Sequence, residues 1–419
     1  MGGRGMIARG RSWGQAILRR MKVAESRGGL GRRLACGALV LGTLALAVPF
    51  LMMVAVVETP EGKAFGYGAL ALIIAPAVAI AFSRWRHAGA SLVVSALLFG
   101  FVLARAPAGV GEPGSGLSSC FLEPHRFARW SPANLIPELD QIKLEATSFR
   151  PLILRLFGEA YAGCVTYQVP VQRELDALPA YRALGSSGMH EGWAEAISKL
   201  CGGPNREPRH WYRYVPPHRA GEKLPVVVFF HGFGSNAKHD LWCWKELADQ
   251  GHFALIEPSI GFGLPVEGEV GIERFLPAWQ ADPDLDWSRA FVAGLSNGAL
   301  RAARAAVERP ALWRGVVLLS PIAPAVAQCG NKVWRGNAPM EFAPYPPVLA
   351  IFGALDGFVS PTYMNLRESQ LSARGISFTL KKYDGLDHYV NFRARDRYYR
   401  DVVEWMADVL AGRRKSTGS

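Results

Sequence analysis

The stretch Ala290–Glu308, AFVAGLSNGALRAARAAVE, decides the fold that we predict for this chain. Its first four residues, Ala290–Ala293, are apolar enough for a buried strand, and its last ten, Ala299–Glu308, have the pattern of a helix. Between them stands Gly294-Leu295-Ser296-Asn297-Gly298, a G-x-S-x-G sequence. A sharp strand-to-helix turn exposes a serine hydroxyl, and small residues two before and two after it let the backbone make that turn. The stretch therefore predicts that Ser296 is a nucleophile.

Apolar and amphipathic segments alternate on both sides of this turn, from His210 onward. The runs expected as strands are Val226–Phe230, Phe253–Glu257, Ala290–Ala293, Gly315–Leu319, Val348–Phe352 and Phe378–Tyr383. The segments expected as helices include Ala299–Glu308, Tyr363–Ala373 and Arg397–Leu410. Buried strands that alternate with helices of ~10–15 residues predict an α/β domain over residues 210–411, with a doubly wound, mostly parallel sheet. The active site of such a sheet lies outside the carboxyl ends of its strands.

A second motif, His231-Gly232-Phe233-Gly234, directly follows the apolar run PVVVFF. Attack on an ester carbonyl places negative charge on its oxygen, and preorganised backbone N–H groups must stabilise that charge. A glycine-rich turn after such a strand supplies one donor, from Gly232 or Phe233, and the residue after the nucleophile, Asn297, supplies the other. His231 precedes Ser296 in the chain, so we expect it to support the loop and not to act as the base.

A third pair of segments supplies an acid and a base. Asp356 follows the apolar run VLAIF within a glycine-flanked turn, and His388 follows FTLKKY by a short loop. A serine nucleophile needs a base that a carboxylate orients, so the order Ser, Asp, His predicts the triad Ser296, Asp356 and His388. Asp384 and Asp387 are nearer His388 in sequence, but a carboxylate directly before a histidine usually points away from its ring. We expect Asp387 to shape its own loop instead.

These motifs, HGFG, GLSNG, the aspartate after FGAL, and GLDH, resemble those of the α/β-hydrolase superfamily. The resemblance is greatest to its poly(3-hydroxybutyrate)-depolymerase, feruloyl-esterase and dienelactone-hydrolase-like branch. It covers about Trp211 to Leu410, roughly half the chain. One departure is that Ala299 follows Gly298 where the family often has a second glycine. The resemblance implies acyl transfer through an acyl-serine, which requires no metal or organic cofactor, and it does not identify the substrate.

The positive charge of the chain is concentrated at its N-terminal end. Residues 1–105 hold 13 Lys and Arg against 3 Asp and Glu, a net +10 of the +12 in the whole chain. A basic segment beside apolar runs indicates membrane topology, and no basic helix or aromatic-studded sheet pattern supports nucleic-acid binding. We therefore expect a membrane protein that does not bind nucleic acid.

Three uncharged runs, residues 35–57, 66–82 and 88–104, predict about three transmembrane helices within a membrane region at 34–105. The basic N-terminus, residues 1–33, and the basic connector at 83–87 are then cytoplasmic, and the chain after residue 105 is extracytoplasmic. Two alternatives are a cleaved signal peptide and a re-entrant hairpin in place of the two shorter runs. We predict a multi-pass protein of the cell membrane.

Residues 106–209 carry no catalytic pattern. Ala106–Ser119 is rich in Gly, Pro and Ser and is predicted to be a flexible linker. Helices are expected near Ile142–Tyr161 and Glu191–Leu200, as a layer packed on the catalytic domain or near the bilayer. Beyond the α/β domain, residues 412–419 form a basic tail.

The cysteines after the membrane region leave disulfide pairing open. An oxidising compartment permits up to two disulfides, and the spacing selects no pairs and fits no zinc or C-x-x-C site. The five cysteines are Cys120, Cys164, Cys201, Cys243 and Cys329.

The sequence predicts a membrane-anchored serine hydrolase of a carboxylic ester, whose substrate is a small-molecule, lipid or polymer ester. A membrane-bound acyltransferase would use the same triad with a hydroxyl acceptor, and a serine peptidase or an inactive scaffold are further alternatives. Trp242, Trp244 and Trp334 either line an acyl pocket or serve as core aromatics.

Overall fold

The computed structural model describes residues 37–82, 85–106, 109–122, 136–148, 150–184, 210–233, 237–259, 272–329, 334–335, 338–339 and 345–414. The chain divides into two compact units, Met1–Ala104 and Arg105–Ser419.

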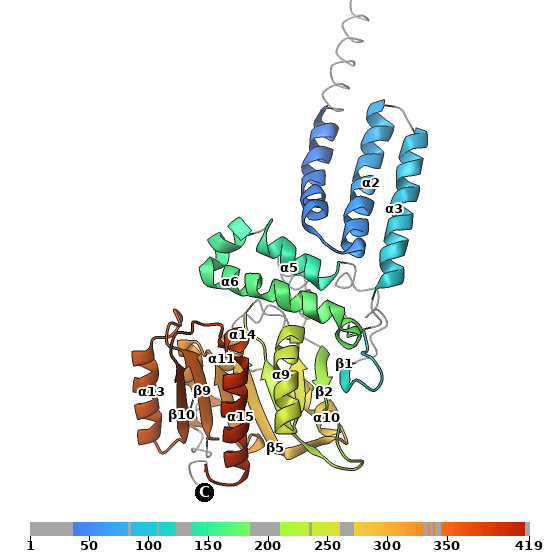
Figure 1. Cartoon of the computed structure of the whole chain (residues 1–419). Helices are drawn as coiled ribbons and strands as arrows, with labels where there is room; N and C mark the ends of the chain where they lie inside the picture. The colour runs from blue at the N-terminus through green and yellow to red at the C-terminus, as the bar shows by residue number, and fades with distance from the viewer. Residues whose placement is uncertain are drawn as a thin grey trace, which may run out of the picture. The chain divides into compact units, whose positions relative to one another are not determined.

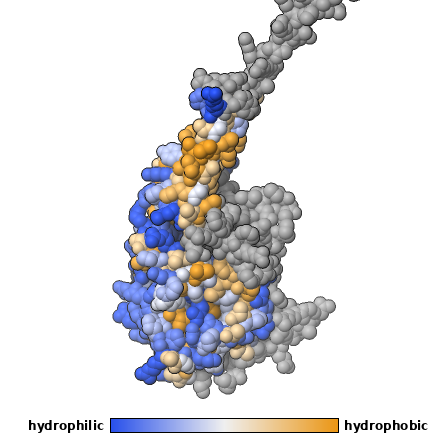
Figure 2. All heavy atoms as spheres, turned by 90° about the vertical axis from the view of Figure 1, so that its right-hand side faces the viewer, coloured by the Kyte–Doolittle hydropathy of each residue, from blue (hydrophilic) through white to orange (hydrophobic). Residues whose placement is uncertain are grey.

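The first unit contains the three expected apolar helices. They are Gly37–Val56, α2 (Pro60–Phe82) and α3 (Trp85–Arg105), and each is long and apolar enough to cross a membrane. Many of their large apolar side chains are exposed, and they appear in orange along these helices in Figure 2. Such surface is stable in lipid and not in water. The three helices therefore suggest a membrane protein.

The second of these helices begins earlier than the uncharged run at 66–82 predicts. Thr59 Oγ1 accepts a hydrogen bond from the Gly62 N–H at 2.9 Å, and Pro60 occupies the first helical position. Both features are typical of a helix start, and Glu61 is favourable there because helix N-termini attract negative charge. The charged residues that ended the predicted span therefore lie inside the helix.

The second unit is built on a sheet of eight strands (Figure 1), in the order β1-β2-β4-β3-β5-β6-β9-β10. Strands β4, β3, β5, β6, β9 and β10 pair in parallel, whereas β2 pairs antiparallel with both of its neighbours, β1 and β4. The strands are β1 (Leu117–Phe121), β2 (His210–Tyr214), β3 (Leu224–Phe230), β4 (Ala254–Pro258), β5 (Leu285–Leu295), β6 (Gly315–Leu319), β9 (Val348–Gly353) and β10 (Phe378–Tyr383). A separate pair is formed by β7 (Trp334–Arg335) and β8 (Ala338–Pro339).

Helices cover both faces of this sheet, as the sequence predicts. One apolar core lies between the sheet and α10 (Leu276–Gln280), α11 (Asn297–Glu308), α12 (Ala323–Gln328) and α13 (Pro361–Ala373), with the short helices η1 (Ile272–Arg274) and η2 (Pro310–Leu312) beside them. The other lies under α9 (Ala237–Gly251), α14 (Val390–Arg393) and α15 (Arg395–Leu410). The β-branched strands are buried on both sides, which explains their continuous apolar runs.

A helical layer precedes the α/β domain and packs on α9. It consists of α5 (Glu138–Ala146), α6 (Arg150–Ala177) and α7 (Pro179–Arg182). Lys238 of α9 forms a buried ion pair with Glu138 at 2.5 Å, and His239 donates a hydrogen bond to Gln172 Oε1 at 2.6 Å. Helices α5 and α6 cover the region expected as one helix near Ile142–Tyr161. That prediction missed a break, which Pro151 explains because proline favours the first turn of a helix.

The linker prediction for residues 106–119 is wrong at its C-terminal end. Strand β1 begins at Leu117 and pairs with β2, and neither of these two strands was expected. Gly116 has a φ of 74°, and a Cβ there would lie 2.3 Å from the Val215 carbonyl oxygen. The glycine that suggested flexibility therefore permits a close approach of two backbones. The helix expected at Glu191–Leu200 lies outside the described residues.

Three of the cysteines are free: Cys120, Cys243 and Cys329. Cys243 and Cys329 are fully buried on different faces of the sheet, in separate apolar cores. Within the part of the chain that the structure describes, no disulfide joins these three.

Candidate active site

Ser296 lies at the sharp turn between β5 and α11. Its φ of 55° and ψ of −113° place it in a strained backbone conformation, and its N–H donates to the Leu319 carbonyl oxygen at 2.9 Å. A Cβ on Gly298 would lie 1.9 Å from the Phe230 carbonyl oxygen, and one on Gly294 would lie 2.3 Å from the Gly298 carbonyl. Both glycines are therefore required for the turn that presents Ser296.

Three side chains from separate loops form one chain of hydrogen bonds at the carboxyl ends of the parallel strands. Ser296 Oγ lies 2.9 Å from His388 Nε2, and His388 Nδ1 lies 2.8 Å from Asp356 Oδ2. The Asp356 side chain is fully buried, and that of His388 is 11 % exposed. A carboxylate that accepts the Nδ1–H leaves the Nε2 lone pair for the serine proton. The structure thus brings together the three residues predicted as the triad.

The aspartate and histidine loops pack tightly on one another. A Cβ on Gly353 would lie 2.2 Å from the Asp387 carbonyl oxygen, and the Leu355 N–H donates to the Leu386 carbonyl at 2.8 Å. Asp356 Oδ1 also accepts the Phe358 N–H at 2.8 Å. Both carboxylate oxygens of Asp356 are therefore engaged, so its direction towards His388 is fixed.

The two nearer aspartates do not reach the histidine ring. Asp387 accepts the Tyr389 N–H at 3.0 Å and pairs with Arg393 at 2.8 Å, so it shapes its own loop. Asp384 is exposed and pairs with Lys382. Neither contacts the His388 ring, and only Asp356 bonds to Nδ1 among the residues that the structure describes.

The glycine-rich loop after β3 lies beside the serine. A Cβ on Gly232 would be 3.5 Å from the Ser296 Cβ, so this loop closely approaches the predicted nucleophile. His231 donates from Nδ1 to the Gly232 carbonyl oxygen at 2.9 Å, and complete burial lowers its pKa to about 4. A neutral imidazole turned to its own loop supports that loop and is far from the role of base. Phe233 follows in the same turn, and Asn297 is the first residue of α11.

Two aromatic rings that were not predicted as part of the site lie against His388. The Phe358 ring centroid is 4.4 Å from that of His388, and the Tyr389 ring is 5.9 Å away in an edge-on arrangement. Phe358 is two residues after Asp356 and Tyr389 is one residue after His388, and these positions could have identified them from the sequence. Of the predicted pocket aromatics, Trp244 is a core residue and Trp242 carries the Arg395 guanidinium over its ring, while the Trp334 side chain lies outside the described residues.

No group of three or more His, Cys, Asp or Glu side chains that could hold a metal ion occurs among the described residues. The site consists instead of a strained serine at a strand-to-helix turn and a histidine that a buried carboxylate orients. With the doubly covered parallel sheet, this arrangement defines a serine hydrolase site on an α/β-hydrolase fold.

Solved structures with a similar fold include a hyperthermophilic esterase from Pyrobaculum calidifontis, at 17 % identity over 64 % of this chain and 99 % of that chain, with a TM-score of 0.41. An S-formylglutathione hydrolase from Agrobacterium tumefaciens matches at 16 % identity over 48 % of this chain and 90 % of that chain, with a TM-score of 0.37. A putative dipeptidyl aminopeptidase IV from Bacteroides ovatus matches at 13 % identity over 48 % of this chain and 33 % of that chain, also with a TM-score of 0.37. No family model and no curated protein matches the sequence.

Proposed function

We propose that this protein is a membrane-anchored serine hydrolase that cleaves a carboxylic ester through an acyl-Ser296 intermediate. The observation that carries the proposal is the pair of bonds at His388, 2.9 Å to Ser296 and 2.8 Å to Asp356. A serine hydroxyl becomes a nucleophile when a base at hydrogen-bond distance accepts its proton. The strained turn and the buried carboxylate both serve that arrangement.

The reaction proceeds in two halves. Ser296 Oγ attacks the ester carbonyl carbon while His388 Nε2 takes its proton, and Asp356 stabilises the resulting imidazolium. The backbone N–H groups of Gly232 or Phe233 and of Asn297 hold the negative oxygen. His388 then protonates the leaving alcohol as the C–O bond breaks. Water attacks the acyl-serine with His388 as base, which releases the acid and restores the serine.

The acyl-serine can also react with an alcohol in place of water, which would make the protein an acyltransferase. The substrate in either case is a small-molecule, lipid or polymer ester, and membrane attachment places the enzyme where apolar esters concentrate. The charge alternation of the connectors supports an extracytoplasmic catalytic unit, with the basic N-terminus in the cytoplasm. Protease added to intact spheroplasts should then cleave the catalytic unit, and protection until lysis would contradict this side.

A fluorophosphonate probe tests the nucleophile. The probe should label the detergent-solubilised full chain, and Ser296→Ala should lose the label and ~10⁴-fold or more of ester turnover. Ser320→Ala is a matched control, because Ser320 is buried at the end of the neighbouring strand β6 and also has a positive φ. The Ser320→Ala protein should still be labelled by the probe. Labelling that survives Ser296→Ala would contradict the assignment.

The same preparation separates hydrolysis from transfer. Products from p-nitrophenyl esters, with and without added alcohols, show whether water or a hydroxyl releases the acyl group. An acyl-alcohol product that outweighs the free acid at low alcohol concentration would favour the transferase. Cleavage of peptides but of no ester would favour a peptidase and overturn the proposed ester substrate.

A further inference from the structure

A row of aromatic rings leads away from the Ser296–His388 pair. The ring centroid of Phe358 lies 4.4 Å from that of the imidazole, and the centroid of Tyr389 lies 5.9 Å from it. Tyr167 of α6 continues the row, with its ring centroid 5.0 Å from that of Tyr389 and 6.3 Å from that of Phe392. The row therefore joins the histidine loop to a helix that lies outside the α/β domain in sequence.

The helical layer contacts the site at two independent points. A Cβ on Gly163 would lie 3.0 Å from the Tyr389 hydroxyl, which shows that α6 packs directly on the histidine loop. Phe233, in the glycine-rich loop, packs against an apolar cluster of the same layer. The cluster consists of Ile142, Ala146, Leu154 and Val169. Residues of α5 and α6 thus border both the base and the expected oxyanion donors.

Several apolar side chains of the Asp356 turn and of α6 are exposed to solvent. Leu355 is 68 % exposed, Phe358 is 48 % exposed and Tyr167 is 38 % exposed. Leu355 and Phe358 flank Asp356 in the same turn, so the exposed surface begins at the reacting groups. Single exposed apolar residues are ordinary, but several that lie beside a candidate reactive centre are typical of a binding surface.

We infer that Leu355, Phe358, Tyr389 and Tyr167 bind the apolar chain of the ester, and that Tyr167 determines how long a chain is accepted. This inference rests on the proposed function. The occupant follows from position, because an ester whose carbonyl carbon meets Ser296 Oγ places its next atoms beside the rings that contact His388. The three apolar helices of the chain provide a second reason, since an apolar ester partitions into the same membrane. The preferred substrate is therefore an ester with a medium or long hydrocarbon chain.

Two series of esters test this with the full chain in detergent. In the first, the p-nitrophenyl esters of acids from acetate to dodecanoate vary the acyl side. In the second, acetates of alcohols from ethanol to dodecanol vary the alcohol side. Tyr167→Ala should lower kcat/KM for the long members of one series by about 5–10-fold and leave acetate esters of short alcohols unchanged. The series that responds identifies which part of the ester lies on the rings.

Matched variants separate contact from folding. Tyr167→Phe keeps the ring and should keep the length preference. Leu410→Ser removes an apolar side chain of the same exposure, 39 %, at the far end of α15, and should change no ratio. Equal changes at every chain length, or a preference for the shortest esters in the parent protein, would overturn the inference.

Fluorophosphonates with ethyl and dodecyl groups provide a readout that does not require turnover. The parent protein should react faster with the dodecyl probe, and Tyr167→Ala should reduce that advantage. Equal labelling by both probes would contradict the chain-binding surface and would still support the proposed serine hydrolase. If neither probe labels the protein, both the proposed function and this inference are contradicted.

Discussion

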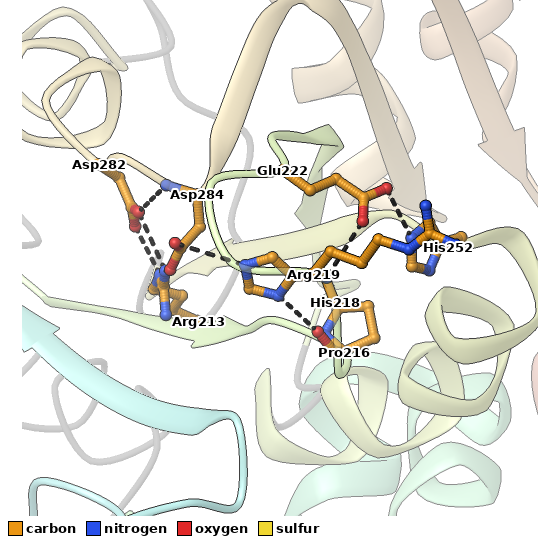
Figure 3. Close-up of polar contacts among 8 residues, drawn as sticks. All are labelled: Arg213, Pro216, His218, Arg219, Glu222, His252, Asp282 and Asp284. Carbon is orange, nitrogen blue, oxygen red and sulfur yellow. Dashed lines mark hydrogen bonds and ion pairs between the residues drawn. The ribbon is translucent and has the colours of Figure 1, made fainter.

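Two histidine–carboxylate clusters lie at opposite ends of the same sheet. At the carboxyl ends of the parallel strands, His388 bonds to Asp356 at 2.8 Å and to Ser296 at 2.9 Å. At their amino ends, His218 lies 3.5 Å from Asp284, beside Arg213 and Asp282 (Figure 3). A histidine near a carboxylate is therefore not what distinguishes a reactive site in this molecule.

The clusters differ in what surrounds the imidazole. Asp356 is fully buried and, among the residues that the structure describes, bonds only to His388 and a backbone N–H, whereas Asp284 is 36 % exposed and also accepts a hydrogen bond from Arg213 Nη2 at 2.6 Å. The second nitrogen of His218 bonds to the Pro216 carbonyl, while that of His388 bonds to a serine. An orienting acid with no competing cation and a nucleophile on the other nitrogen are the features that separate a reactive histidine from a structural one.

The largest expected effect follows from exchanging each acid for its amide. Asp356→Asn should lower kcat by up to ~10⁴-fold, because an amide that donates to Nδ1 favours the wrong tautomer of His388. Asp284→Asn should leave kcat unchanged, since His218 has no nucleophile. Steady-state hydrolysis of a p-nitrophenyl ester by equal concentrations of folded protein measures both.

Asp387→Asn is the control for the acid at the reactive site. The amide oxygen can still accept the Tyr389 N–H while the ion pair with Arg393 is lost, so turnover should fall by far less than for Asp356→Asn. If Asp387→Asn cripples the enzyme while Asp356→Asn works nearly normally, the acid is wrongly assigned.

The end of the sheet that carries the proposed active site was predictable from sequence because each of its parts lies in a local motif. The turn at Ser296 needs Gly294 and Gly298 within five residues, and the Asp356 turn directly follows a buried strand. All six predicted strands are present, and β6 and β10 have the predicted bounds. The order of residues then carried the rest of the site, since strand ends of a parallel sheet meet at one edge.

The remaining parts depend on contacts between distant segments, which no local pattern records. Strand β1 is five residues long and pairs with β2 across a separation of about ninety residues, so its glycine-rich approach resembled a linker. Tyr167 lies more than two hundred residues before Tyr389, and nothing near it in sequence marks it as part of the site. Arg213, Asp282 and Asp284 are likewise brought together only by folding.

A smaller effect, on stability and not on turnover, is expected at the amino ends. Arg213 donates to Asp282 at 2.5 Å and 2.9 Å and to Asp284 at 2.6 Å, with its side chain 19 % exposed. Arg213→Met leaves two half-buried carboxylates without their shared cation and should lower the free energy of unfolding by about 1–3 kcal/mol. Chemical denaturation should show the loss, while kcat of the folded protein stays unchanged. A fall in kcat with unchanged stability would contradict this prediction and would show that the cluster at the amino ends affects turnover.

The smallest effect is expected at the exposed pair beside this cluster, His252 and Glu222, which lie 3.1 Å apart (Figure 3). The pKa of Glu222 is lowered first by the Arg219 backbone N–H and only then by His252, so His252→Asn leaves the larger cause in place. A carboxylate with a lowered pKa stabilises the fold above its ordinary pKa, and that stability is lost as the pH falls through the lowered value. Because the Arg219 backbone N–H, the largest cause, remains in place, the loss of stability at acid pH should shift little. His252 also has a φ of 51°, a left-handed conformation that asparagine tolerates better than most residues, so the substitution relieves backbone strain as it removes the pair. We therefore expect no measurable decrease in the thermal midpoint of unfolding at neutral pH. A decrease as large as that of Arg213→Met would show that an exposed histidine–carboxylate pair stabilises this fold as strongly as the half-buried arginine cluster.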